Sequence, residues 1–521
     1  MKTNSIPLGS CRYRTPFQYA DSYKLSHWIQ YPKDVAHVYS NLTPRSGVRA
    51  HSDRFVFFGL QAFLRKLQET FDRDFFSVPV EEVVDDFQRF HYDFFGEDLS
   101  EEQIHCVRNL HQVGSLPLVF KALPEGTVVQ HGIPVLTVMN TDPSLPWLTN
   151  FIESWMSAEL WGPCTSATTA HLYRLNFDAF AESTSDQDFM PDFQGHDFSF
   201  RGMYGLEASS MSGAAHLLSF KGTDTLHARN WIFQNYGMVE YYAMTDWNPG
   251  LGTSVPATEH SVMSAGGEEC EEETFARLLD LYPKGILSVV SDTWDFWSVV
   301  TEILPRLKER IMARDGKLVI RPDSSPKTPA EILCGDPEAE EGTPEQKGLI
   351  ECLFDTFGGT VNSKGYRQLD SHIGAIYGDS ITLELQEEIL RRLELKGFSS
   401  TNVVLGIGSF TYQHVTRDTH GIAVKATAVI LRDGVCRPIY KAPKTDNGTK
   451  KSHRGFLSVV KTAEGFHVIE QASPAPVDGD MLQTVWENGV FLRTQTFEEI
   501  RRILAEARAQ DIVISPSRVL R

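Results

Sequence analysis

Five short motifs combine residue types that can transfer protons, form covalent intermediates or bind phosphate. They are HDFSFRG (196–202), SFKGTDT (219–225), VPATEHS (255–261), IRPDS (320–324) and GIGSF (406–410). Histidines and carboxylates serve as acids, bases and nucleophiles, guanidinium groups bind anions, and glycine-rich turns offer backbone N–H groups to phosphate. Each motif taken alone could also have a purely structural role. Whether the fold brings the motifs together therefore decides between a functional and a structural interpretation.

Arg321 and Asp323 follow an apolar run and are separated only by Pro322. Alternation along an extended segment places both side chains on the same side. A guanidinium and a carboxylate together suit a phosphate with sugar hydroxyls, or Mg2+. A structural ion pair is the alternative.

His260 directly follows Glu259. A histidine in acidic company can act as a general base, a nucleophile or a metal ligand, although a lone histidine is usually a satisfied polar residue. No second histidine follows at metal-ligand spacing, which disfavours a zinc site.

Three other motifs leave two interpretations open. Phe198 beside Arg201 could form a stacking platform next to an anion site, or a turn packed by aromatic rings. Asp224 could accept hydrogen bonds from an amide or hold a cation, or only form a turn beside Gly222. Gly408 lies in a turn that could bind phosphate, although a G-x-G sequence is a weak signal.

The chain carries 49 basic and 68 acidic residues, a net charge of −19. This balance argues against a nonspecific nucleic-acid binder or an anionic-membrane binder, because both need a broad positive surface. An anionic substrate would require a local basic pocket. One basic stretch could cover a polyphosphate, although a solvated loop is the favoured explanation for most of residues 444–454. It comprises Lys425, Lys441, Lys444, Lys450, Lys451 and Arg454.

The strands that must position these residues recur at intervals along the chain. Apolar runs end at Asp292, Asp323, Asp379 and Gly408, in steps of 31, 56 and 29 residues. About 30 residues make one βα unit, and the longer step could hide another strand. Continuous apolar strands indicate a parallel sheet whose carboxyl ends form the site. A doubly wound sheet would look alike locally, but recurrence on four strands favours a barrel.

The 521 residues are enough for two or more domains. We predict an α/β fold: an irregular (β/α) barrel catalytic domain at 166–414, and a sheet-rich α+β outer domain formed by the N- and C-terminal segments, 1–165 and 415–521. Asp53 is a candidate cap for a helix with an apolar face from Phe57 to Phe71. Thr496 and Glu499 have the spacing of a capping box.

The seven cysteines form no CxxC pair, which suggests free thiols in a reducing compartment. The N-terminal residues contain no apolar signal core, and no run of 18 apolar residues occurs. These features predict a cytoplasmic protein without a membrane span.

Ten segments together resemble the nicotinamide phosphoribosyltransferase family, in the family's order over residues 20 to about 455. They are ADSYKLSHW, VFFGLQ, HDFSFRG, AAHLLSFKGTDT, VPATEHS, SVVSD, IRPDS, NSKGY, GDS and TRD. The resemblance implies a type II phosphoribosyltransferase of NAD salvage, a head-to-tail homodimer with shared sites. Its reaction would convert nicotinamide and phosphoribosyl pyrophosphate to nicotinamide mononucleotide and pyrophosphate with Mg2+, coupled to ATP hydrolysis through a phosphohistidine.

The resemblance also implies roles for individual residues. Phe198, and Tyr23 of the other subunit, would sandwich the pyridine ring, and Asp224 would accept the carboxamide NH2. His260 would be phosphorylated, with Glu259 beside it. The catalytic set would be His260, Glu259, Asp292, Arg321 and Asp323. The other substrate-binding positions would be Asp21, Arg201, Ser288, Gly378 and Asp379, with Gly408 and Arg417 on the 5′-phosphate and Arg45, Lys425 and Lys441 on the polyphosphate.

Two other functions remain as alternatives. A nicotinate phosphoribosyltransferase is disfavoured because Asp224 would repel the acid. A non-catalytic interaction protein of this fold is disfavoured because His260, Arg321 and Asp323 are all present. The chain departs from the family pattern at GIGSF, at Ser380, and in the loops 183–195 and 336–346.

Overall fold

The computed structural model describes residues 13–47, 50–237, 250–323, 327–378, 380–441 and 452–514. The chain forms two compact units. Unit 1 comprises Met1–Cys164 and Arg417–Ile500, and unit 2 comprises Thr165–Thr416 and Arg501–Arg521. The predicted α/β class is confirmed, with a parallel sheet in unit 2 and an antiparallel sheet in unit 1.

Unit 2 contains a six-stranded parallel sheet in the order β7-β6-β13-β12-β9-β8. The predicted apolar runs form four of its strands, while β9 pairs directly with β12, so the long step hides no strand of this sheet. Instead, β10 (Gly359–Val361) and β11 (Arg367–Leu369) form a separate antiparallel pair. The sheet strands are β6 (Gly195–Asp197), β7 (Gly222–Thr223), β8 (Lys284–Val290), β9 (Asp315–Arg321), β12 (Ile373–Tyr377) and β13 (Val403–Ile407).

One extended segment bridges the two edges of this sheet. Thr253 forms a parallel bridge with Gly222 of β7, and Ala257 forms one with Ser288 of β8. The Thr253 carbonyl accepts from the Thr223 N–H at 3.0 Å, and the Pro256 carbonyl accepts from the Ser288 N–H at 2.9 Å. The segment makes the sheet an irregular barrel and delivers Glu259 and His260 beyond the end of β8.

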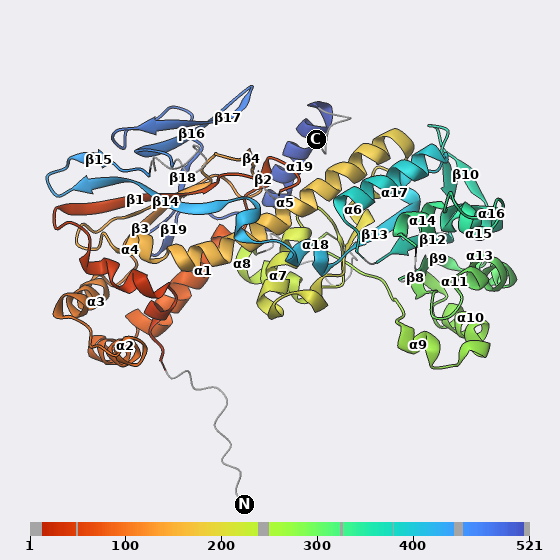
Figure 1. Cartoon of the computed structure of the whole chain (residues 1–521), viewed down its shortest axis with the longest axis horizontal. Helices are drawn as coiled ribbons and strands as arrows, with labels where there is room; N and C mark the ends of the chain where they lie inside the picture. Colours follow the sequence, from red (N-terminus) through yellow and green to blue (C-terminus); the bar gives the residue numbers. More distant parts are fainter. Residues whose placement is uncertain are drawn as a thin grey trace, which may run out of the picture. The chain divides into compact units, whose positions relative to one another are not determined.

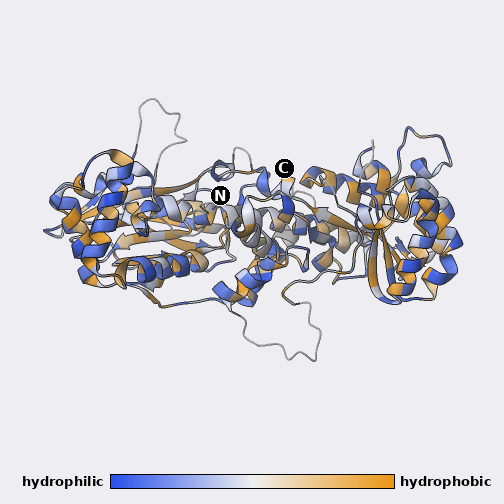
Figure 2. Cartoon of the chain, turned by 90° about the horizontal axis from the view of Figure 1, so that it is seen from below, coloured by the Kyte–Doolittle hydropathy of each residue, from blue (hydrophilic) through white to orange (hydrophobic). Residues whose placement is uncertain are grey.

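Apolar side chains of these strands pack against the surrounding helices in one continuous core. The strands are largely hydrophobic, whereas the outward helix faces are hydrophilic (Figure 2). The helices assigned wholly to unit 2 are α6 (Pro191–Gln194), α7 (Gly205–His216), α8 (His227–Tyr236), α9 (His260–Ser264), α10 (Glu271–Leu281), α11 (Phe296–Ser298), α12 (Leu304–Arg306), α13 (Lys308–Met312), α14 (Pro329–Cys334), α15 (Pro344–Lys347), α16 (Leu349–Phe357), α17 (Leu383–Leu395) and α18 (Ser409–Gln413). Two further helices cross the division between the units: α5 (Glu153–Thr184) and α19 (Phe497–Ile514).

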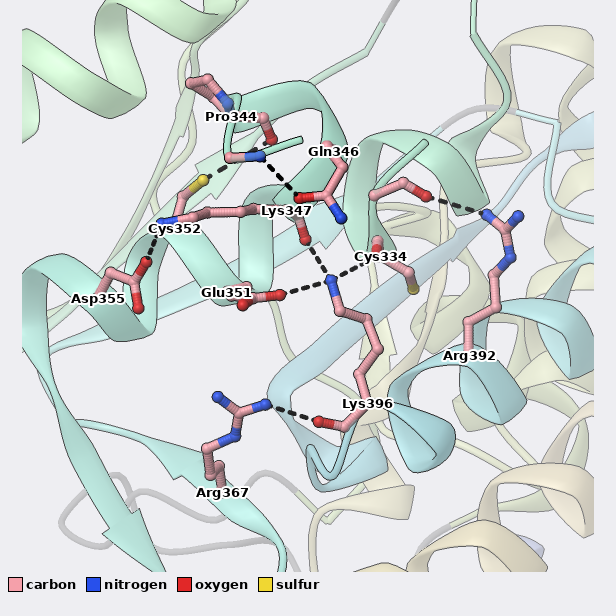
Figure 3. Close-up of polar contacts among 12 residues, drawn as sticks. Cys334, Pro344, Gln346, Lys347, Glu351, Cys352, Asp355, Arg367, Arg392 and Lys396 are labelled. Atoms are coloured by element: carbon pink, nitrogen blue, oxygen red, sulfur yellow. Dashed lines mark hydrogen bonds and ion pairs between the residues drawn. The ribbon is translucent and has the colours of Figure 1, made fainter. Parts of the chain in front are cut away.

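The acidic loop that matched no family segment is anchored by a lysine (Figure 3). Lys396, just after α17, donates to the carbonyls of Cys334 at 3.0 Å and Lys347 at 2.6 Å, and pairs with Glu351 at 2.5 Å. Cys334 and Lys347 are the last residues of α14 and α15. A cation at two helix C-termini complements both helix dipoles, which fixes the ends of the loop between them.

Unit 1 contains a seven-stranded sheet in the order β15-β14-β1-β5-β3-β18-β19. β1 (Val35–Pro44) pairs antiparallel with β14 (Ile422–Leu431), so N- and C-terminal segments share one sheet as expected. Figure 1 shows α1–α3 below this sheet and the β16–β17 hairpin above it. The remaining elements are β2 (Arg54–Val56), β3 (Leu118–Ala122), β4 (Val128–Gln130), β5 (Leu136–Asn140), β15 (Cys436–Pro438), β16 (Phe456–Thr462), β17 (Gly465–Gln471), β18 (Gln483–Glu487), β19 (Val490–Phe491), α1 (Leu60–Phe71), α2 (Val80–Phe95), α3 (Glu101–Val113) and α4 (Leu148–Phe151).

Two predicted helix starts had different outcomes. The Thr496–Glu499 capping box is present, with reciprocal bonds of 2.8 and 3.2 Å. The Asp53 cap is wrong, because residues 54–56 form β2 and α1 begins after Gly59. Gly59 has φ = 107°, a conformation that favours glycine, and its N–H donates to Glu125 at 2.6 Å.

Six cysteines fall within the described ranges, and all are free thiols. None of the helices in the described ranges combines the length and apolar character needed to cross a bilayer.

Candidate functional site

Four of the predicted catalytic residues meet at the carboxyl ends of β8 and β9. Arg321 Nε lies 3.1 Å from Asp323 Oδ1, and its Nη2 donates to the Thr258 carbonyl at 2.7 Å. The Asp323 N–H donates to Asp292 Oδ2 at 3.0 Å. His260 Nε2 lies 3.8 Å from Asp292 Oδ1. The i, i+2 spacing thus places Arg321 and Asp323 together, as predicted, and the structure adds Asp292 and His260 to the same cluster.

Burial and the neighbouring charges act in opposite directions on the pKa of Asp323. Burial raises the pKa of Asp323, the Arg321 charge lowers it, Asp292 raises it again, and the net direction is upward. The pKa of Asp323 stays raised although a cation lies beside it, so that cation does not fully compensate for burial and for the second carboxylate. A further positive group near Asp323 would therefore be favourable.

Phe198 provides a ring held in a fixed position. Its N–H donates to the Ile407 carbonyl at 3.0 Å. A Cβ added at Gly406 would overlap the Phe198 ring and lie 2.7 Å from the Gly378 Cα, so glycine is required there. The Gly406 and Gly378 backbones therefore form the floor beneath the ring. Phe198 is half-buried and not exposed, so one face at most is open.

Asp224 is a partly exposed carboxylate held by two donors. His196 Nε2 and Ser254 Oγ contact the same oxygen, Oδ1, at 2.9 and 2.5 Å. Burial by itself would raise the pKa of Asp224, but hydrogen bonding to His196 and Ser254 and the charges of His196 and Arg321 lower it overall. Asp224 is consequently an ionised acceptor at neutral pH, whose side chain is 48% exposed.

The other predicted positions of unit 2 show less pairing. Glu259 accepts a short hydrogen bond from Ser261. Buried Ser288 has a hydroxyl with no hydrogen-bond partner among the described residues. Arg201 is exposed, and the space around the Gly408 Cα is open. Asp379 lies outside the described residues.

Ser380, noted in the sequence as a departure, has φ = 52°. This left-handed conformation favours glycine, which explains the smaller residue expected there.

Unit 1 contains a local cluster of basic side chains of the kind that an acidic chain would need to bind an anion. Lys24 is buried and pairs with Glu153 at 2.5 Å. The pKa of half-buried Lys425 is lowered, first by burial and also by the positive charges of Arg45, Arg417 and Lys24, against the opposing effect of Glu153. Four cations thus share one nearby carboxylate, which leaves a surplus of positive charge.

The other predicted residues of unit 1 have separate surroundings. Arg45 Nε donates to the Gly421 carbonyl at 3.1 Å. Tyr23 is 56% exposed, and its ring lies edge-to-face against His27 with centroids 5.1 Å apart. Asp21 precedes the short helix Ser22–Leu25, but its carboxylate accepts from Ser154 at 2.5 Å and does not cap the helix. Lys441 is exposed and its N–H donates to Ser452 at 3.1 Å.

Several residues at these sites have no role in the sequence-based assignment. His196 lies inside HDFSFRG, two residues from Phe198, and its place in that motif is the signal that could have identified it. The others are Ser254, Gly406, Lys24 and Glu153.

Comparison with known proteins shows the class to which the fold belongs. The model described as "Nicotinate phosphoribosyltransferase (NAPRTase) family" matches residues 193–488, and "Nicotinamide phosphoribosyltransferase, N-terminal domain" matches residues 17–119. A structure titled nicotinate-nucleotide pyrophosphorylase from Pyrococcus furiosus aligns with a TM-score of 0.56 at 14% identity, covering 98% of this chain and 99% of that one. The human nicotinic acid phosphoribosyltransferase aligns with a TM-score of 0.53 at 16% identity, covering 95% and 94%. The chain is a phosphoribosyltransferase.

Curated relatives identify the family within this class of enzymes. The nicotinamide phosphoribosyltransferase of Acinetobacter baylyi is 46% identical over 505 residues, 94% of this chain and 97% of the relative. That of Mycoplasma pneumoniae is 36% identical, covering 84% and 93%. The chain therefore belongs to the nicotinamide phosphoribosyltransferase family.

Proposed function

We propose that this enzyme transfers the phosphoribosyl group of phosphoribosyl pyrophosphate to nicotinamide, giving nicotinamide mononucleotide and pyrophosphate. The observation that carries the choice of base is Asp224, an ionised acceptor bonded to His196, whose ring in turn contacts that of Phe198. A carboxylate accepts hydrogen bonds from a carboxamide NH2 and repels a carboxylate. Phe198 orients the flat ring, which lowers the entropic cost of attack. The pyridine nitrogen is neutral and carries a lone pair, so no general base is needed.

The cluster of Arg321, Asp323 and Asp292 suits the other substrate. Breaking the bond between the anomeric carbon and pyrophosphate develops positive charge on the ribose and negative charge on the departing oxygens. Carboxylates near the ribose and a guanidinium near the pyrophosphate stabilise both charges in the transition state. Arg45, Lys425, Lys441 and Arg417 would contribute further positive charge toward the phosphates, with Gly408 at the 5′-phosphate.

We further propose that Mg2+ accompanies the pyrophosphate. The described residues contain no cluster of three or more ligands able to hold a metal ion. Mg2+ commonly uses only one or two carboxylates and takes its remaining ligands from water and substrate phosphates. Asp292 and Asp323, joined by the 3.0 Å bond, fit that requirement. The ion would neutralise the pyrophosphate charge.

ATP coupling is assigned to His260, whose side chain is 48% exposed. Asp292 on the Nε2 side favours the proton there, which leaves the Nδ1 lone pair as nucleophile, 3.3 Å from the Thr293 hydroxyl. Nδ1 would attack the γ-phosphorus of ATP, a P–N bond would form, and the P–O bond to ADP would break. Water would later hydrolyse the phosphohistidine to histidine and phosphate. A homodimer in which Tyr23 of one subunit stacks opposite Phe198 of the other completes the proposal.

One experiment tests both parts. Purified enzyme is incubated with phosphoribosyl pyrophosphate and Mg2+ and either nicotinamide or nicotinate, with and without ATP, and the mononucleotide is quantified. We expect preference for nicotinamide and stimulation by ATP. Equal use of nicotinate, or no product from either base, would contradict the assignment of substrate.

His260→Ala separates the coupling from the transfer. The variant should remain folded, retain slow turnover of nicotinamide and lose all stimulation by ATP, and it should not be labelled by γ-32P-ATP. A variant that stays ATP-stimulated, or that loses all turnover while folded, would show that His260 has another role.

A further inference from the structure

His196 lies between the two groups assigned to nicotinamide. Its ring centroid is 4.7 Å from that of Phe198, with the planes tilted by 43°, and its Nε2 is 2.9 Å from Asp224 Oδ1. The His196 side chain is only 11% exposed. A Cβ added at Gly222 would lie 2.6 Å from His196 Nδ1, so the ring is also confined on its far edge. The imidazole cannot turn away without leaving both the platform and the carboxylate.

The bonding pattern at Asp224 is asymmetric. An ionised carboxylate can only accept hydrogen bonds, so the His196 nitrogen facing it carries a proton. Both His196 and Ser254 bond to Oδ1, and neither bonds to Oδ2. Two donors on one oxygen fix the rotation of the carboxylate and leave Oδ2 as its acceptor for a ligand.

We propose that His196 is a positioning and specificity-determining residue: it aims Asp224 and, through its own protonation, sets how strongly the site distinguishes a carboxamide from a carboxylate. The inference rests on the proposed role of Asp224. With neutral imidazole the pair carries one negative charge and repels nicotinate. With imidazolium the pair is neutral overall, while Asp224 still accepts from an amide. Selectivity for nicotinamide therefore falls as His196 becomes protonated.

Three charged or titratable groups among the described residues lie around the pair. The charged and titratable groups around the pair are Asp197 on the same strand, His216 on α7 and Arg321 on β9. Arg321 lowers the pKa of Asp224, and Asp197 raises that of His216. Burial lowers the pKa of His216 to about 4, so His216 stays neutral through the relevant range.

The test measures the ratio of kcat/KM for nicotinamide to kcat/KM for nicotinate from pH 5.5 to 8.5. We expect the ratio for the natural enzyme to rise at least fivefold across this range. His196→Gln keeps a donor at the reach of Nε2 but cannot become charged, so its ratio should vary by less than twofold. His196→Phe keeps the ring and loses the donor, and its kcat/KM for nicotinamide should fall at least tenfold at every pH.

A double-mutant cycle separates positioning from a structural role. In the Asp224→Asn background, His196→Gln should change the ratio by less than twofold, because its partner is gone. A pH-independent ratio in the natural enzyme, or a pH response that persists in His196→Gln, overturns the inference. If His196→Phe does not fold, the pH profiles of the natural enzyme and of His196→Gln still test the inference. No turnover of either base refutes the proposed function as well, whereas turnover of nicotinamide with a flat ratio refutes only the role of His196.

Discussion

Two lysines of this chain are held in opposite ways. Lys396 in unit 2 contacts two helix-terminal carbonyls and the Glu351 carboxylate, all within 3.0 Å (Figure 3). Half-buried Lys425 in unit 1 forms neither a hydrogen bond nor an ion pair through its side chain with any described residue, and three neighbouring cations lower its pKa further after burial has lowered it.

The difference separates a structural cation from a candidate binding cation. Folding satisfies Lys396 with protein acceptors, so its charge is used within the chain. Lys425 lies among like charges, an arrangement that disfavours folding and that a bound anion would relieve. Whether a lysine is paired within the protein therefore distinguishes Lys425, the candidate for phosphate binding, from Lys396, which anchors the loop. The number of lysines does not.

The largest effect is expected at Lys425. Lys425→Met should lower kcat/KM for phosphoribosyl pyrophosphate by about 100-fold, or ~2.7 kcal/mol, because a charge-assisted bond to phosphate is worth about 1.5–3 kcal/mol. Initial rates at limiting phosphoribosyl pyrophosphate measure this. Lys121→Met, at an exposed position of β3 in the same unit, is the matched control and should be unchanged. Equal losses in both variants would mean that Lys425 has no specific contact with phosphate.

Lys396→Met should lower stability and leave activity unchanged, in contrast to Lys425→Met. Its loss leaves two carbonyls and Glu351 without their donor, which costs about 2 kcal/mol in the free energy of unfolding, since water reaches a side chain that is 30% exposed. Urea unfolding monitored by circular dichroism measures this, and kcat per folded enzyme should not change. Lys308→Met, exposed on α13, serves as control. Lost activity with full stability would place Lys396 near the reaction and erase the contrast with Lys425.

The parallel sheet was predictable only where its strands are long. β8, β9, β12 and β13 have five to seven residues and contain runs of apolar side chains, and such runs stand out in a sequence. β6 and β7 have three and two residues, too few for any periodicity. Their strand conformation depends on pairing with β13 and with each other, which is a tertiary property.

The same limit applies to the candidate site. The contact between Arg321 and Asp323 follows from two residues on one extended segment, so local geometry predicts it. The pair of His196 and Asp224 joins positions 28 residues apart, and Lys24 and Glu153 are 129 residues apart. Nothing in the local pattern encodes those pairs. A lysine is almost never fully buried without a partner, so Lys24 resembles a surface residue until Glu153 is placed beside it.

The smallest effect concerns the stability of the Lys425 variant and its dependence on pH. The pKa of Lys425 is lower in the folded protein than the ordinary lysine value, so the folded protein binds its proton less tightly than the unfolded chain does. The resulting destabilisation is complete below the folded pKa and disappears as pH rises to the unfolded pKa near ~10.4. Lys425→Met should therefore be slightly more stable than the natural protein at pH 7, by under about 1 kcal/mol because solvent screens a half-buried charge. That advantage should shrink as the pH approaches 10. Adding millimolar pyrophosphate at pH 7 should reverse the order, because the anion stabilises only the protein that has Lys425. Thermal unfolding of both proteins at pH 7 and 9.5, with and without pyrophosphate, measures all of these differences. A variant that is less stable at pH 7 would mean that Lys425, like Lys396, is satisfied within the fold.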